Sequence, residues 1–295
     1  MIWLIGCKGM LGSEIARQLE ENKIDFVGTD REVDFTNSQA CEDFVKDKQI
    51  DFIINCAAYT AVDKAESDFD MAEKLNVHGP AVIAALSKKI GATLIHISTD
   101  YVFDGTAASP LSEEMPVSPL GVYGKTKAAG EKAVIENTDK YYILRTAWLY
   151  GWAGKNFVYT MIRAMNMRDS VSVVNDQKGS PTFAGDLAKV ILRIIDKGNV
   201  DYGIYHCTDL GEITWWDFTN EIKKQAAECG LIQNPNCIVT PCTTKEYPTP
   251  AKRPAYSVLS KEKIQKALDL KLPDWKDSLH VFLSSPLFDK SRIEK

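Results

Sequence analysis

The 295-residue chain has no long apolar run, no excess of positive charge and little histidine. None of its hydrophobic stretches approaches the roughly 18–20 residues that a membrane-spanning helix needs, so we expect no membrane partner. The net charge of −5 disfavours a surface for nucleic acid or anionic lipid. Apolar residues make up 45% of the chain and charged residues 25%, a balance typical of soluble globular proteins that excludes a disordered chain.

Cysteine is present in a pattern that favours neither disulfides nor a metal site. The seven cysteines are odd in number, and no two of them have Cys-x-x-Cys spacing. The four histidines show no ligand spacing either. Residues 1–5 are apolar but too short for a signal peptide and are typical of a buried strand. We therefore expect reduced thiols, no metal and a cytoplasmic protein.

Short apolar segments alternate with segments of helical period through the first half of the chain. The expected strands are residues 2–5, 24–28, 52–55, 93–98 and 142–145. The expected helices are residues 11–19, 38–47, 72–89 with a kink at Gly79-Pro80, and 123–136. This alternation predicts an α/β fold built on a doubly wound, Rossmann-like parallel sheet with helices on both faces.

The alternation loosens after about residue 150. A turn is expected at residues 179–182 and helices at 186–195 and 214–229, while residues 234–257 are rich in Pro, Thr and Asn. We expect a dinucleotide-binding domain over residues 1–150 and a smaller α/β substrate-binding lobe over residues 151–295. This division leaves room for the chain to interleave between the two.

Candidate dinucleotide-binding residues follow the first two strands. Gly6, Gly9 and Gly12 form a G-x-x-G-x-x-G turn before a helix, where backbone N–H groups can approach a pyrophosphate. Asp30 follows 18 residues later, near the spacing of an acid that binds the adenosine ribose. Arg31 could instead receive a 2′-phosphate, so the choice between NADPH and NADH stays open. An ordinary glycine-rich turn and a solvated charged turn are the alternative interpretations.

Two further segments fit a dinucleotide. Asp34 and Phe35 could frame an adenine, although a helix cap with a buried phenylalanine is an equally compatible interpretation. Ala57 and Ala58 follow the third strand, where small side chains leave room for the nicotinamide ribose and phosphates. In a parallel sheet, ligands bind beyond the carboxyl ends of the strands, and these residues fall there.

Tyr123 and Lys127 stand four residues apart, on one face of the expected helix. An ammonium there favours the phenolate and lowers the pKa of the tyrosine, which suits proton transfer to a carbonyl oxygen. About one such pair is expected by chance in a chain of this composition.

Thr99 ends a buried strand and could bind a substrate oxygen, although such positions are commonly capped by Ser or Thr. Trp148 fits either the core or a flat wall for a sugar or base.

Together these motifs resemble the extended short-chain dehydrogenase/reductase family over essentially the whole chain. The segments that carry the resemblance are 6–12, 55–66, 98–105, 123–127, 145–148, 179–182 and 253–254. It implies that Tyr123 is the proton donor, Lys127 its pKa partner and ribose anchor, and Thr99 the third catalytic residue. The implied substrate contacts are Thr99, Asp100, Tyr101 and Trp148. The implied cofactor contacts are Gly6, Gly9, Met10, Leu11, Gly12, Asp30, Arg31, Asp34, Phe35, Ala57, Ala58, Tyr59, Thr60, Tyr123 and Lys127.

The resemblance also implies a reaction, namely reduction of the C4 ketone of a dTDP-linked 4-dehydro-6-deoxy-L-sugar by hydride from NADPH or NADH. The partner is then a nucleotide-sugar substrate, with the chain a monomer or homodimer. The related sugar-nucleotide 4,6-dehydratases carry Asp-Glu after the threonine, whereas here Asp100 is followed by Tyr101. In the dehydratases the glutamate is the base that abstracts the proton at C5, so its replacement by Tyr101 favours simple ketone reduction. The alternatives are another nucleotide-sugar ketoreductase, an epimerase, or a non-catalytic member such as the regulatory β subunit of methionine adenosyltransferase.

Some members of the family bind magnesium through glutamates at a dimer contact. Glu14 matches one of these positions, but Gly185 and Asp186 stand where another glutamate is expected. We therefore predict no metal.

Overall fold

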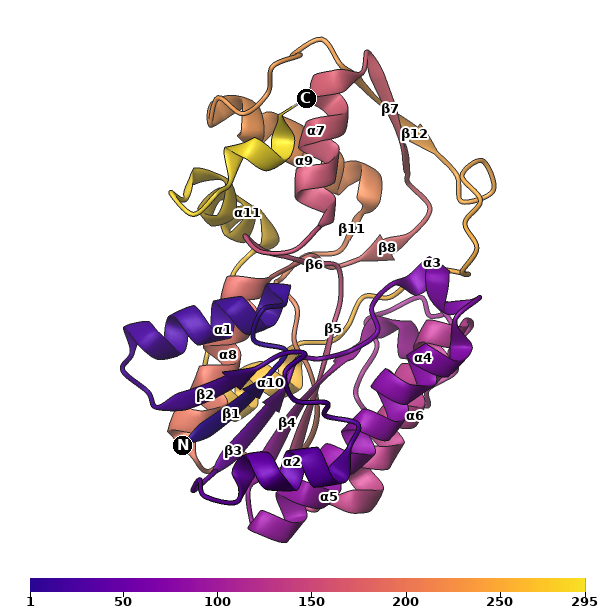
Figure 1. Ribbon diagram of the computed structural model, residues 1–295. Helices are drawn as coiled ribbons and strands as arrows, with labels where there is room; N and C mark the ends of the chain where they lie inside the picture. The colour runs from indigo at the N-terminus through magenta and orange to yellow at the C-terminus, as the bar shows by residue number, and fades with distance from the viewer. Residues whose placement is uncertain (295) are drawn as a thin grey trace.

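The computed structural model describes residues 1–294 as a large lobe, with a parallel sheet between helices, and a smaller lobe beside it (Figure 1). The sheet has six strands in the order β10-β5-β4-β3-β1-β2, and every neighbouring pair is parallel. Its strands are β1 (Ile2–Ile5), β2 (Phe26–Thr29), β3 (Phe52–Asn55), β4 (Thr93–Thr99), β5 (Tyr141–Thr146) and β10 (Gly203–His206). The predicted doubly wound sheet is confirmed.

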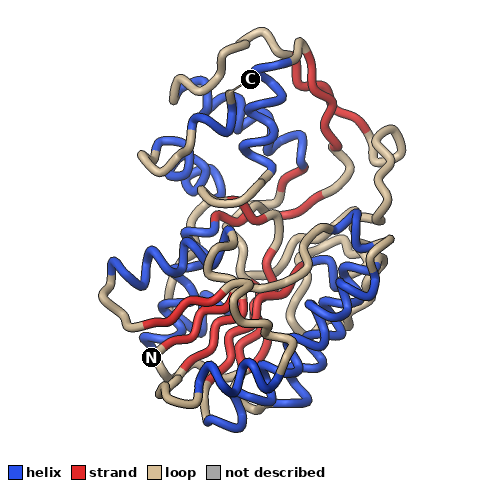
Figure 2. Tube along the Cα trace, viewed as in Figure 1, coloured by secondary structure: helices blue, strands red, loops and turns tan. Residues whose placement is uncertain are grey.

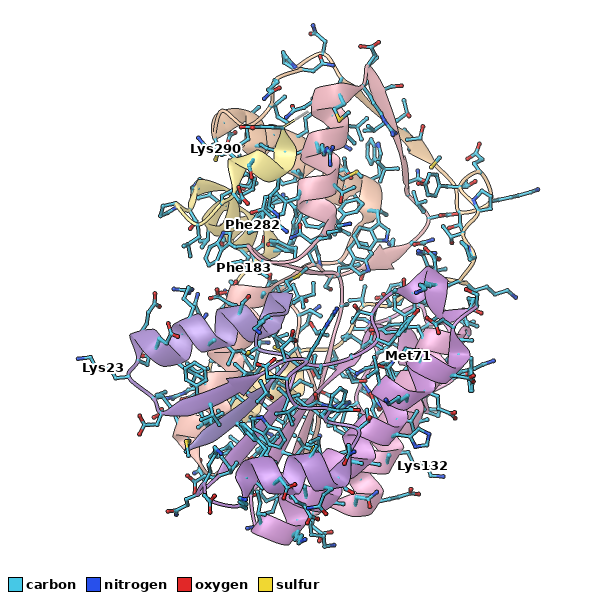
Figure 3. All side chains as sticks on the ribbon, viewed as in Figure 1. Lys23, Met71, Lys132, Phe183, Phe282 and Lys290 are labelled. Carbon is cyan, nitrogen blue, oxygen red and sulfur yellow. The ribbon has the colours of Figure 1, made fainter. Side chains whose placement is uncertain are left out.

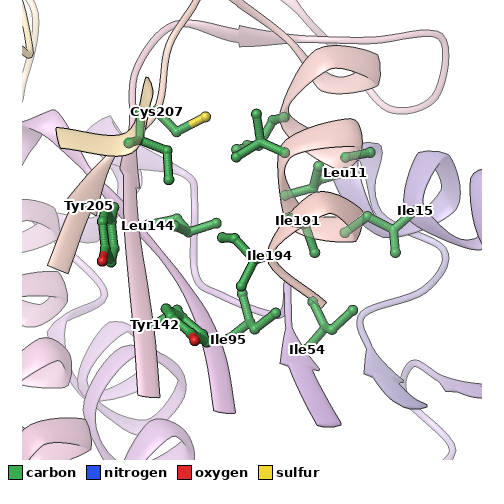
Figure 4. Packing of buried hydrophobic residues seen from close by; sticks show 14 of the residues in the cluster. Leu11, Ile15, Ile54, Ile95, Tyr142, Leu144, Ile191, Ile194, Tyr205 and Cys207 are labelled. Carbon is green, nitrogen blue, oxygen red and sulfur yellow. The ribbon is translucent and has the colours of Figure 1, made fainter. Parts of the chain in front are cut away.

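Helices cover both faces of this sheet because alternate strand residues point to opposite sides. On one face, Ile2 and Leu4 pack with α1 (Met10–Glu21), α8 (Ala184–Lys197) and α10 (Glu262–Leu268), as Figure 4 shows in part. On the other face, Trp3 and Ile5 pack with the remaining large-lobe helices. These are α2 (Ser38–Val45), α5 (Gly79–Ile90) and α6 (Val122–Asn137). All four residues of β1 are buried, as expected for a strand covered on both sides.

The helix expected over residues 72–89 is longer and is interrupted before Gly79. It consists of α4 (Phe69–Glu73), one π-helical turn, η1 (Lys74–His78), and α5. Pro80 is the second residue of α5, which follows the π turn directly. The predicted kink is therefore a π turn, a distortion that is frequent near functional sites. A short helix, α3 (Val62–Ala65), precedes α4.

The smaller lobe surrounds an aromatic core that includes Tyr150, Phe183, Phe218 and Phe282; Figure 3 labels two of these. Its helices are α7 (Phe157–Met167), α9 (Trp215–Glu228), α11 (Trp275–Ser284) and the 3₁₀ turn η3 (Lys290–Ile293). Its short strands are β6 (Leu149–Tyr150), β7 (Ser170–Val174), β8 (Lys178–Gly179), β9 (Thr182–Phe183), β11 (Ile213–Thr214) and β12 (Ile238–Cys242). The turn expected at residues 179–182 is thus a two-residue link between β8 and β9. Figure 2 draws the short strands of this lobe in red.

The chain returns to the large lobe after residue 150. Strand β10 pairs with β5, with Tyr205 opposite Leu144, and α8 packs against α1. The sheet therefore does not end at the boundary that the sequence predicts, because the outer edge of β5 is covered by a strand some 60 residues beyond it. All seven cysteines are free thiols. Across residues 1–294, no helix has the length and apolar character required to cross a membrane.

Candidate active site

A cleft of about 830 Å³ lies along the carboxyl ends of the central strands. Most residues predicted from the sequence line it. These are Gly6, Gly9, Met10, Leu11, Asp30, Arg31, Asp34, Phe35, Ala57, Ala58, Thr60, Thr99, Asp100, Tyr101, Tyr123, Lys127 and Trp148. Gly12 and Tyr59 are absent from the lining. The loops that follow β1, β2, β3, β4 and β5 thus meet in one place, as parallel-sheet geometry requires.

The glycine turn brings the backbone close to the cleft. Gly6 has φ of +76°, and a Cβ there would lie 2.9 Å from the backbone nitrogen of Ala57. Gly9 is the N-cap of α1, and no side chain caps that helix, which leaves its first N–H groups available to an anion. Gly12 does not line the cleft, and its contact with the cofactor stays a prediction. A Cβ there would lie 2.0 Å from the carbonyl oxygen of Gly6, so this glycine allows α1 to pack on the turn.

The predicted adenosine end of the cleft is formed by the segment after β2. The Asp34 carboxylate accepts hydrogen bonds from the backbone N–H of Thr36 at 3.0 Å and from its hydroxyl at 2.6 Å. These bonds hold the pKa of Asp34 below its usual range. Phe35 is buried against Gly79, where a Cβ would lie 2.1 Å from its ring. Phe35 is therefore buried as one interpretation required, the cap of the following helix is Asn37, and the contact of Asp34 and Phe35 with an adenine stays a prediction.

The loop after β3 is held by Asn76, a residue that the sequence analysis missed. Its side chain accepts from the backbone N–H of Tyr59 at 2.8 Å and donates to the Tyr59 carbonyl at 3.2 Å. It also donates to the hydroxyl of Thr126 on α6 at 3.1 Å. The Tyr59 hydroxyl donates to Asp68 at 3.0 Å and Tyr59 does not line the cleft, so its cofactor contact stays a prediction. A buried asparagine inside an apolar helix was the available signal.

Three predicted catalytic residues meet at the end of β4 and the start of α6. The Thr99 hydroxyl donates to Asp100 at 3.1 Å and accepts from the backbone N–H of Tyr101 at 3.3 Å. Lys127 is only 2% exposed, and its ammonium donates to the carbonyl of Ile97 at 2.6 Å. The rings of Tyr101 and Tyr123 lie edge to face, with centroids 5.5 Å apart. The cleft therefore holds a hydroxyl, a phenol and a cation together.

Burial dominates the electrostatics of this group. It raises the pKa of Tyr123 to about 12, a hydrogen bond with Thr99 acting in the opposite direction. It lowers the pKa of Lys127 to about 8, partly offset by the carboxylate of Glu131. Burial also raises the pKa of Asp100 to about 6. In this structure desolvation outweighs the lowering of the Tyr123 pKa that is expected from Lys127, whose ammonium donates to the carbonyl of Ile97.

Behind these residues lies a buried ion pair that the sequence did not reveal. Arg145 on β5 donates two hydrogen bonds to the carboxylate of Glu131 on α6, at 2.9 and 2.7 Å. The hydroxyl of Ser98 donates to the same carboxylate. His206 on β10 lies 3.4 Å from the Arg145 guanidinium, and that guanidinium together with burial lowers the pKa of His206 to about 3. The network ties α6 to three strands.

Lys155, from the loop after β6, is a further lining residue that was not predicted.

The residues around Glu14 do not fit a metal. Its buried carboxylate accepts from the guanidinium of Arg17 at 2.6 and 3.0 Å and from Gln18 at 2.7 Å. A cation therefore already occupies the place that a metal would need. Within residues 1–294, no group of three or more His, Cys, Asp or Glu side chains is arranged to hold a metal ion.

Comparison with known proteins identifies the family. The RmlD substrate binding domain model matches residues 1–287. The chain belongs to the RmlD substrate binding domain family. A curated relative from Escherichia coli K12, named dTDP-4-dehydrorhamnose reductase, is 41% identical over 300 residues, covering 99% of each chain. A relative from Streptomyces antibioticus, named a probable dTDP-4,6-dihydroxy-2-methyloxan-3-one 4-ketoreductase, is 39% identical and covers 95% of this chain and 93% of its own.

Solved structures of this family superpose on nearly the whole chain. A dTDP-4-dehydrorhamnose reductase from Clostridium acetobutylicum has a TM-score of 0.89 and 45% identity, covering 96% of this chain and 98% of its own. The Bacillus anthracis enzyme of the same name, solved in complex with NADP, has a TM-score of 0.88 and 36% identity, covering 95% and 97%. The family resemblance carried by the sequence motifs is confirmed.

Proposed function

We propose that the protein reduces the C4 ketone of dTDP-4-dehydrorhamnose to give dTDP-L-rhamnose, the last step of dTDP-rhamnose biosynthesis. The observation that carries this proposal is the meeting of Thr99, Tyr123 and Lys127 in one cleft with an uncapped glycine turn. The relatives that bear this activity in their names match the chain over nearly its full length.

The residues of the cleft fit a nicotinamide dinucleotide. The N-terminus of α1 and the Gly6–Gly9 turn would hold the pyrophosphate, and Asp30 and Arg31 the adenosine ribose. The bound NADPH or NADH supplies the hydride that adds to C4 of the sugar. Lys127 would hold the nicotinamide ribose, since its ammonium already lies buried in the cleft.

Tyr123 is the residue that would supply the proton. Tyr123 donates its phenolic proton to the C4 oxygen as negative charge develops there. A pKa of about 12 keeps this phenol protonated at neutral pH, so it is a donor before reduction begins. The Thr99 hydroxyl and the Lys127 ammonium would stabilise the transient phenolate. Asp100, Tyr101 and Trp148 would contact the deoxysugar.

A second candidate is a different nucleotide-sugar ketoreductase, favoured by the Streptomyces antibioticus relative. An epimerase and a non-catalytic regulatory subunit are the remaining alternatives, and the retained Tyr123, Lys127 and Thr99 weigh against the latter. We further propose a cytoplasmic monomer or homodimer that binds neither metal nor nucleic acid.

The test is turnover by the purified chain. The protein is incubated with dTDP-4-dehydrorhamnose and NADPH or NADH, nicotinamide oxidation is followed by absorbance, and the sugar product is identified. We expect oxidation that depends on both substrate and enzyme, with dTDP-L-rhamnose as the product. Absence of oxidation with both cofactors would contradict the proposal and favour the alternatives.

A further inference from the structure

One wall of the cleft contains the indole of Trp148, which has an unusual backbone conformation. Three non-glycine residues among residues 1–294 have positive φ, namely Lys23, Trp148 and Asp269. Lys23 and Asp269 lie at helix C-termini, where the left-handed conformation is common. Trp148 follows a strand and has φ of +48°. A bulky residue keeps such a conformation only where its surroundings enforce it, and these positions cluster at functional sites.

Two residues of the smaller lobe enforce it. The rings of Trp148 and Trp215 are stacked, with centroids 3.5 Å apart and planes 12° from parallel. Gly179 packs against the same indole, so closely that a Cβ there would lie 2.6 Å from Cε2 of Trp148. The pairing of β8 with β11 places Gly179 opposite Ile213, two residues before Trp215. The antiparallel pair of β8 and β11 therefore positions both Gly179 and Trp215. We call these two residues the clamp on Trp148.

Trp215 is itself fixed. It is the first residue of α9, whose N-cap Thr214 forms a capping box with Asp217. The Asp217 carboxylate accepts from the hydroxyl of Thr214 at 2.7 Å. On the helix side, the Phe157 ring lies 4.5 Å from the Trp215 ring. The first turn of α9 thus offers a rigid aromatic surface to Trp148.

We propose that Trp215 and Gly179 are positioning residues that hold Trp148 as a preformed wall for the sugar nucleotide. This inference rests on the proposed function and deepens it. An indole offers a flat apolar surface that suits the C–H face of a deoxysugar or a pyrimidine base. Because the indole is already ordered, binding does not lose the conformational entropy of immobilising it. The clamp therefore sets affinity for the nucleotide sugar and leaves the cofactor site and the proton transfer unchanged.

The test compares W148A, W215A, W215F, G179A and the double variant W148A/W215A with the wild type. We expect W215A and G179A to raise KM for dTDP-4-dehydrorhamnose by about tenfold, with the Kd of NADPH unchanged within about twofold. W215F should restore most of the wild-type KM. The double variant should have the KM of W148A alone, because Trp215 acts through Trp148. G179A keeps every aromatic ring, so it separates positioning from loss of core packing.

Trp216 supplies the matched control. It is the next residue on α9, and its indole N–H donates to the carbonyl of Val239 at 3.3 Å, away from the cleft. W216A should keep the wild-type KM. Circular dichroism adds a second readout, since stacked indoles give an exciton couplet that W148A and W215A should lose and W216A should keep.

The outcomes separate the two proposals. Turnover by the wild type with an unchanged KM in both W215A and G179A would overturn the positioning role alone. Additive effects in W148A/W215A would overturn it as well. Absence of turnover by the wild type would overturn the proposed function and, with it, the role assigned to the clamp.

Discussion

The ammonium of Lys127 donates a 2.6 Å hydrogen bond to the carbonyl of Ile97. The lysine is thereby anchored to the strand that ends in Thr99. On α6, Lys127 lies one helical turn after Tyr123. Burial lowers the pKa of Lys127 to about 8 and raises that of Tyr123 to about 12. The two residues therefore lose their protons in the order opposite to that of a solvated pair, in which the tyrosine ionises first.

This order predicts the pH dependence of turnover. Lys127 is an ammonium below pH about 8 and neutral above it. Because only the charged form stabilises a phenolate at Tyr123, kcat/KM should fall as pH rises through about 8. In Lys127→Arg the fall should move to higher pH, since a guanidinium stays protonated. Initial rates between pH 6 and pH 10, taken as roughly two units either side of the pKa, would show it. An identical profile in the variant would contradict the assignment.

Tyr123→Phe should lower kcat by on the order of 10²–10³, the usual effect of removing one donor to a developing oxyanion. The Kd of NADPH should stay within about threefold, because the ring remains in place. Stopped-flow or steady-state assays and cofactor fluorescence measure the two quantities. Tyr141→Phe, on β5 and outside the cleft lining, is the control and should keep wild-type turnover. Near-normal kcat in Tyr123→Phe would rule out its role as the proton donor.

Arg31→Ala tests the choice between cofactors. If the guanidinium receives the 2′-phosphate, its loss should weaken NADPH binding by roughly 10- to 100-fold and leave NADH binding unchanged, as expected for one charge-assisted hydrogen bond. Lys89→Ala removes an exposed cation outside the cleft lining, paired with Glu42 at 2.9 Å, and should alter neither. Titration of each variant with NADPH and with NADH measures the two dissociation constants. Equal losses for NADPH and NADH would show that Arg31 does not read the phosphate.

Glu131→Gln should destabilise the fold by about 3–5 kcal/mol, because it leaves the Arg145 guanidinium buried without its carboxylate. Urea unfolding of the wild type and the variant at pH 7 measures the difference. Glu136→Gln breaks an exposed pair on the same helix, with Lys132, and should cost less than about 1 kcal/mol. Similar effects of the two substitutions would mean that the buried network contributes little.

Asp100 should make the fold less stable at neutral than at acid pH. Its folded pKa of about 6 lies above the ordinary value of 3.8, so the folded chain binds the extra proton. The contribution is fully present below pH about 4 and is lost as pH rises through about 6. Asp100→Asn should therefore gain about 2 kcal/mol on the wild type between pH 4 and pH 7. Unfolding curves at both pH values measure this gain, and a constant difference would contradict it.

Local patterns in the sequence accounted for the sheet and most of the cleft. Gly6, Asp30 and Thr99 each follow an apolar segment, and parallel strands place such positions at one edge. What was missed depends on contacts between distant parts of the chain. Asn76 has no motif around it, because its role comes from a π turn against Tyr59 and Thr126. The pKa of Tyr123 was misjudged because burial at that point cannot be read from a spacing of four residues.

The edge strand β10 also bears on how the protein is made. Its partner β5 ends at Thr146, yet β10 begins only at Gly203 and α10 only at Glu262. A nascent chain released to residue 150 would present β5 as an open apolar edge, the kind of surface that recruits other strands. The large lobe therefore cannot finish folding during synthesis until most of the chain has emerged. A gene fragment cut at the apparent boundary should aggregate, whereas the intact chain closes its own sheet.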